Sequence, residues 1–192
     1  GFNKVVALSL PPDRTGVSPL QASGPVFTHL ERALSREYSL RQEDLSDDTV
    51  AADADILAVI APRSLGSRAL FAIDQFLMRG GTVVLVTAPF SASITAGKLQ
   101  LNTYDSGLQE WLAHHGINIE ESVVLDSQNA SFTVPVTRLA GDYEFQDAEL
   151  RNYPYFIDLR PPGLAPRHAV TANLPQVTMA WASPISVKPN SG

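Results

Sequence analysis

The sequence has 192 residues, with 20 acidic and 14 basic side chains and a formal net charge of -6 at pH 7. A content of 44% hydrophobic and 18% charged residues is typical of a folded protein and argues against a disordered chain. The basic residues are scattered singly, so we expect no nucleic-acid partner. The sequence contains no cysteine, which excludes disulfides, Cys-ligated metals and a thiol nucleophile.

Short apolar runs alternate with helical patterns in the first half of the chain. The runs at residues 5–8, 39–41, 55–61 and 82–86 predict strands, and the third is the continuous apolar run expected of a parallel strand covered on both faces. Helical spacing predicts a helix over residues 26–38 and a second helix that ends at Gly80-Gly81. The apolar stripe of the second helix consists of Leu70, Ile73, Phe76 and Leu77.

Beyond Phe90, a stretch of small and polar residues predicts a loop, followed by a helix with Leu108, Trp111 and Leu112 that closes at Gly116. A fifth strand is predicted at residues 122–125. Five alternations of strand and helix predict an α/β fold, because parallel neighbours need crossover helices. We expect a doubly wound, mostly parallel sheet of the flavodoxin-like kind, with strand order 2-1-3-4-5.

The pattern changes in the C-terminal third to alternating apolar and polar residues, which predicts antiparallel strands. We therefore expect one α/β domain over residues 1–192, with a β-rich insertion at residues 131–160. The proline-rich tail predicts mostly loop, with one turn of helix near residues 171–174 and a last strand at residues 185–187.

Three sequence blocks carry a family resemblance. They are residues 71–90 (FAIDQFLMRGGTVVLVTAPF), 152–156 (NYPYF) and 168–174 (HAVTANL). In this order they resemble the auxiliary component of gliding-motility-type ABC transport systems, with Ala88 and Ala169 standing where that family often has Asp and Pro. This family is related in fold to the intraflagellar-transport-type domain and is similar to the class I glutamine amidotransferases.

The resemblance implies an extracytoplasmic, periplasmic domain of a membrane-anchored protein that accompanies an ABC permease and an ATPase. It also makes a carbohydrate or a component of the cell envelope conceivable as a ligand. The start at Gly1 and the end at Ser191-Gly192 suggest a fragment excised from a longer parent.

We expect a protein that is not an enzyme, with no catalytic residue, no cofactor and no metal. Ser91 is the nearest substitute for a nucleophile, but it lacks the flanking glycines of a nucleophile elbow. His114 and His115 are adjacent and point about 100° apart on a helix, so they cannot grip a metal from one face. No glycine-rich phosphate loop follows a strand.

Ligands of open α/β sheets bind at the carboxyl ends of the strands, near the point where the strand order reverses. This rule selects the loops at residues 9–14, 61–64 and 87–91. Within them, an anion clamp and an apolar platform are available from four side chains: Arg14, Arg63, Ser64 and Phe90. The leading hypothesis is a non-catalytic binding domain. The alternatives are a hydrolase on an amidotransferase-like scaffold, and a structural spacer or docking domain.

Overall fold

The computed structural model describes residues 4–11, 27–95, 98–141 and 143–188. The chain divides into two compact units, Gly1–Asn118 with Val187–Gly192, and Ile119–Ser186. The boundary falls within β7 (Ile117–Ile119) and β11 (Ile185–Val187), which pair as a two-stranded sheet. The predicted last strand is therefore confirmed.

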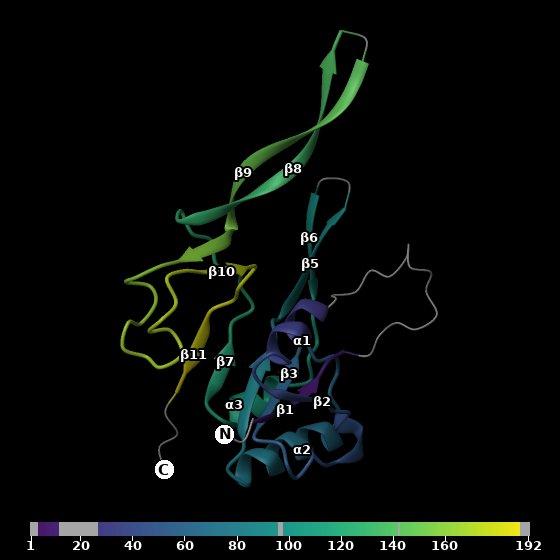
Figure 1. Cartoon of the computed structure of the whole chain (residues 1–192), viewed down its shortest axis with the longest axis vertical. Helices are drawn as coiled ribbons and strands as arrows, with labels where there is room; N and C mark the ends of the chain where they lie inside the picture. The colour runs from purple at the N-terminus through teal and green to yellow at the C-terminus, as the bar shows by residue number, and fades with distance from the viewer. Residues whose placement is uncertain (1–3, 12–26, 96–97, 142, 189–192) are drawn as a thin grey trace. The chain divides into compact units, whose positions relative to one another are not determined.

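The first unit is built on a four-stranded sheet in which all neighbouring strands are parallel (Figure 1). Its order is β2-β1-β3-β4, as predicted for the first four strands. The bounds are β1 (Val5–Ser9), β2 (Ser39–Gln42), β3 (Ile56–Ile60) and β4 (Thr82–Val86). Strand order therefore reverses between β1 and β3, and the carboxyl ends of both strands lie at one edge of the sheet.

Helices cover both faces of β1 and β3. Ala58 and Ile60 of β3 belong to a buried cluster against which Leu30 and Leu34 of α1 (Thr28–Leu34) pack. Leu57 and Val59 alternate with them and point to the opposite face. There α2 (Ser67–Met78) buries four residues: Ala69, Ala72, Ile73 and Phe76. Full burial of one large apolar side chain contributes about 1.5 to 3 kcal/mol, so this core anchors the sheet.

The predicted doubly wound, flavodoxin-like or amidotransferase-like sheet is wrong, because β4 is an edge strand. Residues 122–125 form no strand beside it: Val124 N–H donates to the Ala182 carbonyl at 2.9 Å, and Leu125 is 59% exposed. After α3 (Gln109–His114), the chain forms β7 and pairs with β11. One face of β4 consequently leaves Val84 and Val86 exposed, and antiparallel strands make up much of the rest of the fold.

A hairpin occupies the stretch predicted as a loop after Phe90. It joins β5 (Phe90–Thr95) to β6 (Lys98–Thr103) in antiparallel register. Only two residues separate the strands, and Leu99 and Leu101 alternate with polar residues in the second one. This alternation is the signal that could have identified the hairpin.

The second unit contains a three-stranded antiparallel sheet in the order β10-β9-β8. Its strands β8 (Asn129–Ala140) and β9 (Tyr143–Leu159) fall in the segment predicted to be β-rich, and β10 is Val177–Ala180. The predicted turn of helix near residues 171–174 is a set of hydrogen-bonded turns, in which Thr171 and Ala172 both donate to the His168 carbonyl.

The block at residues 152–156 forms an irregularity in β9. Ser131 pairs with Asn152, whereas Asn129, two residues earlier, pairs with Ile157, so β9 contains extra residues at this point. The Pro154 carbonyl accepts a hydrogen bond from Asp126 N–H, and the Tyr155 carbonyl accepts one from Trp181 N–H. The rings of this block cluster with that of Trp181, whose ring centre lies 5.2 Å from that of Phe156.

Residues 131–140 and 143–152 form a long twisted two-stranded ribbon, named the ribbon below (Figure 1). It is exposed on both faces: Leu139 and Leu150 are each 71% exposed, and Tyr143 is 81% exposed. An isolated two-stranded hairpin is only marginally stable in water. Because its apolar side chains are exposed, they contribute little to the stability of the ribbon.

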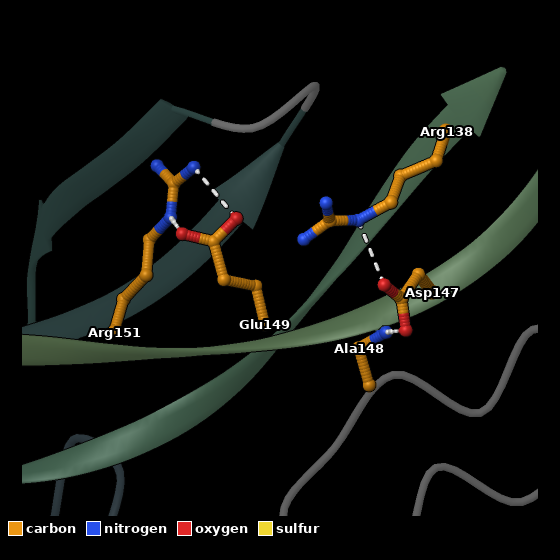
Figure 2. A network of polar contacts seen from close by, with 5 residues as sticks. All are labelled: Arg138, Asp147, Ala148, Glu149 and Arg151. Atoms are coloured by element: carbon orange, nitrogen blue, oxygen red, sulfur yellow. Dashed lines mark hydrogen bonds and ion pairs between the residues drawn. The ribbon is translucent and has the colours of Figure 1, made fainter.

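Most charges of the ribbon lie on one of its faces (Figure 2). Arg138 Nε lies 2.7 Å from Asp147 Oδ2, and Arg151 Nε lies 3.3 Å from Glu149 Oε1. Because paired residues of an antiparallel ribbon share a face, the pairing register places all four on the same side. On the opposite face, Glu144 is the single charged residue among the paired positions of the ribbon that the structure describes.

Candidate ligand-binding site

A pocket of about 580 Å³, named the edge pocket below, lies at the carboxyl ends of β1 and β3. Three segments line it: residues 9–11 at the end of β1, residues 44–46 after β2, and residues 60 and 62–69, which lead from β3 into α2. Small-molecule sites in proteins commonly enclose about 300 to 1,000 Å³. The edge pocket therefore has the size and position that the rule for open parallel sheets predicts.

The wall after β2 is a short 3-10 helix, η1 (Leu45–Asp47). Asp44 caps it, because its Oδ1 accepts a hydrogen bond from Ser46 N–H at 3.0 Å. Leu45 is buried and holds this turn to the unit, where η1 contacts α2. The carboxylate of Asp44 is therefore already engaged in local structure.

A second wall is the first turn of α2, which contributes Ser67, Arg68 and Ala69. Gly66 precedes the helix in an extended conformation and supplies no capping side chain, and the first turn contains no acidic residue. The first intrahelical bond of this turn runs from Leu70 N–H to the Gly66 carbonyl at 3.1 Å. The helix N-terminus at this wall therefore carries a partial positive charge, and no carboxylate in the first turn balances this charge.

The loop after β3 has an unusual backbone. Ala61 and Ser64 both have a φ of 45°, a left-handed conformation that non-glycine residues adopt at some energetic cost. Ser64 N–H and Leu65 N–H donate to the carbonyls of Asp105 and Ser106, both at 3.0 Å. Ser64 Oγ also lies 3.1 Å from Asp105 Oδ2. The segment after β6 therefore holds this loop in its strained shape.

Gly107 permits this close approach. It has a φ of 76°, and a Cβ at this position would lie 2.5 Å from both the backbone nitrogen and the carbonyl oxygen of Leu65. Both contacts are with backbone, so a side chain at residue 107 would force the two segments apart. Glycine is required here for its conformation and for its lack of a side chain.

Tyr104 contacts the loop at two residues, Ala61 and Arg63. Its hydroxyl donates to the Ala61 carbonyl at 2.5 Å, and the Arg63 guanidinium lies 5.4 Å from the centre of its ring. Burial raises the pKa of Tyr104, and the positive charge of Arg63 partly offsets this rise. Arg63 is exposed, and no salt bridge to a carboxylate is formed by it within the described part of the chain.

The second arginine of the edge pocket is Arg68. Its Nε lies 3.8 Å from Asp48 Oδ1, at the long end of the range for an ion pair, and its side chain is 77% exposed. An exposed pair at this distance contributes little to stability. The guanidinium of Arg68 therefore keeps donors available for a further partner.

The structure brings together two of the four predicted ligand residues. Arg63 and Ser64 line the edge pocket, whereas Phe90 begins β5 and is not among the described lining residues. Arg14 lies outside the described residues. Ser64 is committed to Asp105, so its main role is to fix the loop. Arg68 also lines the pocket, and Tyr104 contacts the loop that lines it; neither residue was predicted from the sequence.

One sequence signal could have identified Arg68. It stands two residues after Gly66, at the start of the apolar stripe of α2, and therefore in the first turn of a helix that follows a buried strand. Tyr104 offered no such signal, because its contact with Ala61 depends on the unpredicted hairpin β5–β6.

The residues considered for catalysis have structural contacts. Ser91 lies in β5 and pairs with Asn102, and none of the hydrogen bonds of the described residues joins it to a histidine. His115 packs against Trp111, with 4.3 Å between ring centres, and its Nε2 lies 3.7 Å from Asp74 Oδ1. His168 Nδ1 accepts from Val170 N–H at 3.3 Å.

The described residues bear on two further features, metal sites and membrane-spanning helices. No group of three histidine or carboxylate side chains in this part of the chain is arranged so that it could hold a metal ion. Among the helices of the described ranges, none is long and apolar enough to cross a membrane.

Comparison with known proteins gives one family. Residues 19–192 match the model of a family described as ABC-type uncharacterized transport system, the auxiliary ABC transporter family. No curated protein and no solved structure shows significant similarity to the chain. The match extends over both units of the structure and includes all three sequence blocks that carry the resemblance. The chain therefore belongs to the auxiliary family of ABC-type uncharacterized transport systems.

Proposed function

We propose that this chain is a non-catalytic, extracytoplasmic binding domain of the auxiliary component of an ABC transport system of the gliding-motility type. Membership of the family implies association with other transporter components, and the permease and the ATPase are the partners that we propose. The observation that carries the binding role is the edge pocket, which lies where strand order reverses in a parallel sheet.

The contacts of the edge pocket support binding over catalysis. The strained loop at Ala61 and Ser64 is held by backbone hydrogen bonds from residues 105 and 106, so the pocket wall is preorganised. Ser91 is paired with Asn102 in a hairpin and is not among the described lining residues of the pocket. Among the described residues, no serine of the pocket is hydrogen-bonded to a histidine, and the one pocket serine that is bonded to a carboxylate, Ser64, holds the loop to Asp105.

Thermal-shift screening of the purified chain against sugars and cell-envelope fragments tests the binding role. A ligand that prefers the native state raises the temperature of the unfolding midpoint. At a ligand concentration of 100 times Kd, the free energy of unfolding increases by about 2.7 kcal/mol. We expect at least one such compound. A Ser91→Ala variant should bind it unchanged, whereas Gly107→Ala should weaken binding because it displaces the pocket loop. A screen without any shift would contradict the binding role.

The extracytoplasmic placement has a direct test, because the chain contains no cysteine. A single cysteine introduced at the exposed Thr137, in the membrane-anchored parent protein that we propose, should react with a membrane-impermeant maleimide added to spheroplasts. The parent protein without this substitution is the control. Labelling that requires lysis of the spheroplasts would place the domain in the cytoplasm and contradict the proposal.

The ribbon favours docking as a second candidate function. It carries the exposed apolar side chains of Leu139 and Leu150 on the face that is almost free of charge. Protein interfaces are depleted of charged residues at their centre. A protein component of the same transport system that covered this face would remove these side chains from water.

Co-purification with the permease and ATPase of the same system tests docking. A double variant, Leu139→Ser with Leu150→Ser, should lose the complex, because both side chains lie on the face with few charges. The matched control, Arg138→Ser with Arg151→Ser, changes the charged face and should retain it. Equal retention by both variants would exclude this face as the docking surface.

A further inference from the structure

We propose that the edge pocket recognises an anionic group, a carboxylate or a phosphate, which the guanidinium groups of Arg63 and Arg68 hold. This inference rests on the proposed binding function and adds the class of ligand. Both arginines line the pocket, one from the loop after β3 and one from the first turn of α2. Two guanidinium groups on adjacent segments form the donor arrangement that suits carboxylate and phosphate oxygens.

The charges around the edge pocket leave both arginines available. Arg63 forms none of the salt bridges found among the described residues, and Arg68 has only the 3.8 Å contact to Asp48. Asp44 is the one acidic residue among the described lining residues, and its carboxylate caps η1. The described lining therefore presents two cations and one carboxylate, which is already hydrogen-bonded, while the carboxylate of Asp48 lies 3.8 Å from Arg68.

Arg63 is also held in place. Its guanidinium stacks over Tyr104, and the Tyr104 hydroxyl bonds the carbonyl of Ala61 two residues before Arg63. A cation that is oriented before binding loses less side-chain entropy when a ligand arrives. Ser9, Ser46 and Ser67 line the same pocket, and a serine hydroxyl can donate to further oxygen atoms of a ligand.

Two-dimensional NMR of the isotope-labelled chain, titrated with inorganic phosphate and with acetate, tests this inference. Sodium chloride at matched ionic strength is the control. We expect saturable shifts of the amide signals of Ser67, Arg68 and Ala69 and of the Arg63 side-chain signal with at least one of the two anions, and none with chloride. A preference between phosphate and acetate would identify the anionic group.

Matched variants separate recognition from overall charge. Arg63→Gln combined with Arg68→Gln should weaken the apparent affinity at least tenfold. Arg32→Gln combined with Arg36→Gln removes the same charge from two exposed positions, one in α1 and one after it. This control should change the apparent affinity less than twofold. The single variant Arg68→Gln keeps the stacking of Arg63 on Tyr104 and should still lose most of the affinity.

The outcomes are distinguishable. Saturable anion shifts that persist in the Arg63 and Arg68 variants, or shifts that chloride reproduces, would overturn the inference. A neutral sugar that shifts the pocket amides while both anions fail to do so would overturn the anionic class and leave the binding function intact. If no compound of any class shifts these amides, both the inference and the proposed function fail.

Discussion

Substitution of Gly107 by alanine should destabilise the first unit by more than the conformational strain of the residue alone. The φ of 76° costs a non-glycine residue about 1 to 2 kcal/mol. The new Cβ would also meet the Leu65 backbone at 2.5 Å, so the loop must move away from residues 105 and 106. Weakening the two backbone hydrogen bonds there costs about 0.5 to 1.5 kcal/mol each. The expected loss is about 2 to 5 kcal/mol.

Gly80→Ala is the matched control, because Gly80 has a φ of 87° and a Cβ added to it would meet nothing within 4 Å. It carries the conformational cost without the steric contact, so we expect a loss of about 1 to 2 kcal/mol. Hydrogen-deuterium exchange with mass spectrometry should show faster exchange of the Leu65 amide in Gly107→Ala than in Gly80→Ala. Equal exchange and equal stability in both variants would refute the steric argument.

Three further predictions concern the core, the ribbon and pH. Ile73→Ala, which empties a fully buried site of α2, should cost about 2 to 5 kcal/mol in urea unfolding, whereas Phe71→Ala on the exposed side of the same helix should cost far less. Arg138→Ala should cost at most about 1 kcal/mol, a loss that high salt abolishes, since its ion pair with Asp147 is half-exposed; a larger loss would contradict this assignment. The pKa of Tyr104 is raised in the folded state, so the folded protein favours the neutral hydroxyl. The stability that results is fully present below the ordinary tyrosine pKa of 10.0 and is lost as the pH rises through the pKa of the folded state. Tyr104→Phe should therefore lose less stability than the wild type above that pH, measured by urea unfolding, and an identical decline would exclude Tyr104 as the titrating group.

The parallel sheet could be predicted because its central strands are covered on both faces. Residues 55–61 form an unbroken apolar run, and the strand β3 that results is buried against α1 on one side and α2 on the other. Residues 122–125 contain a similar, shorter run. Their backbone bonds, and those of the residues that follow, go to residues 182 and 154, far along the chain, and no local pattern carries that information. The extrapolation from four parallel strands to a doubly wound sheet failed at this point.

The candidate site was predictable in position and only partly in composition. The rule for strand ends depends on topology alone, and two of the three loops that it selected, those after β1 and β3, line the edge pocket. Residues 87–91, the third, are not among the described lining residues. The roles of Ser64 and Phe90 depend on the hairpin β5–β6, a stretch whose small and polar residues had predicted a loop. Asp105 and Tyr104 follow this hairpin directly. Asp105 accepts a hydrogen bond from the Ser64 hydroxyl, and the Tyr104 ring lies under the Arg63 guanidinium, so Ser64 and Arg63 have neighbours that the sequence did not predict.

The irregularity in β9 has a consequence for how the ribbon folds. Slippage of β9 by one residue along β8 would move Asp147 and Glu149 to the other face and separate Asp147 from Arg138. A bare two-stranded ribbon has little to prevent such slippage. The extra residues at 153–156 cannot slide, because the Pro154 and Tyr155 carbonyls are bonded to Asp126 and Trp181 outside the ribbon. This aromatic segment therefore acts as a register lock, which fixes from one end the alignment of every residue pair out to the tip.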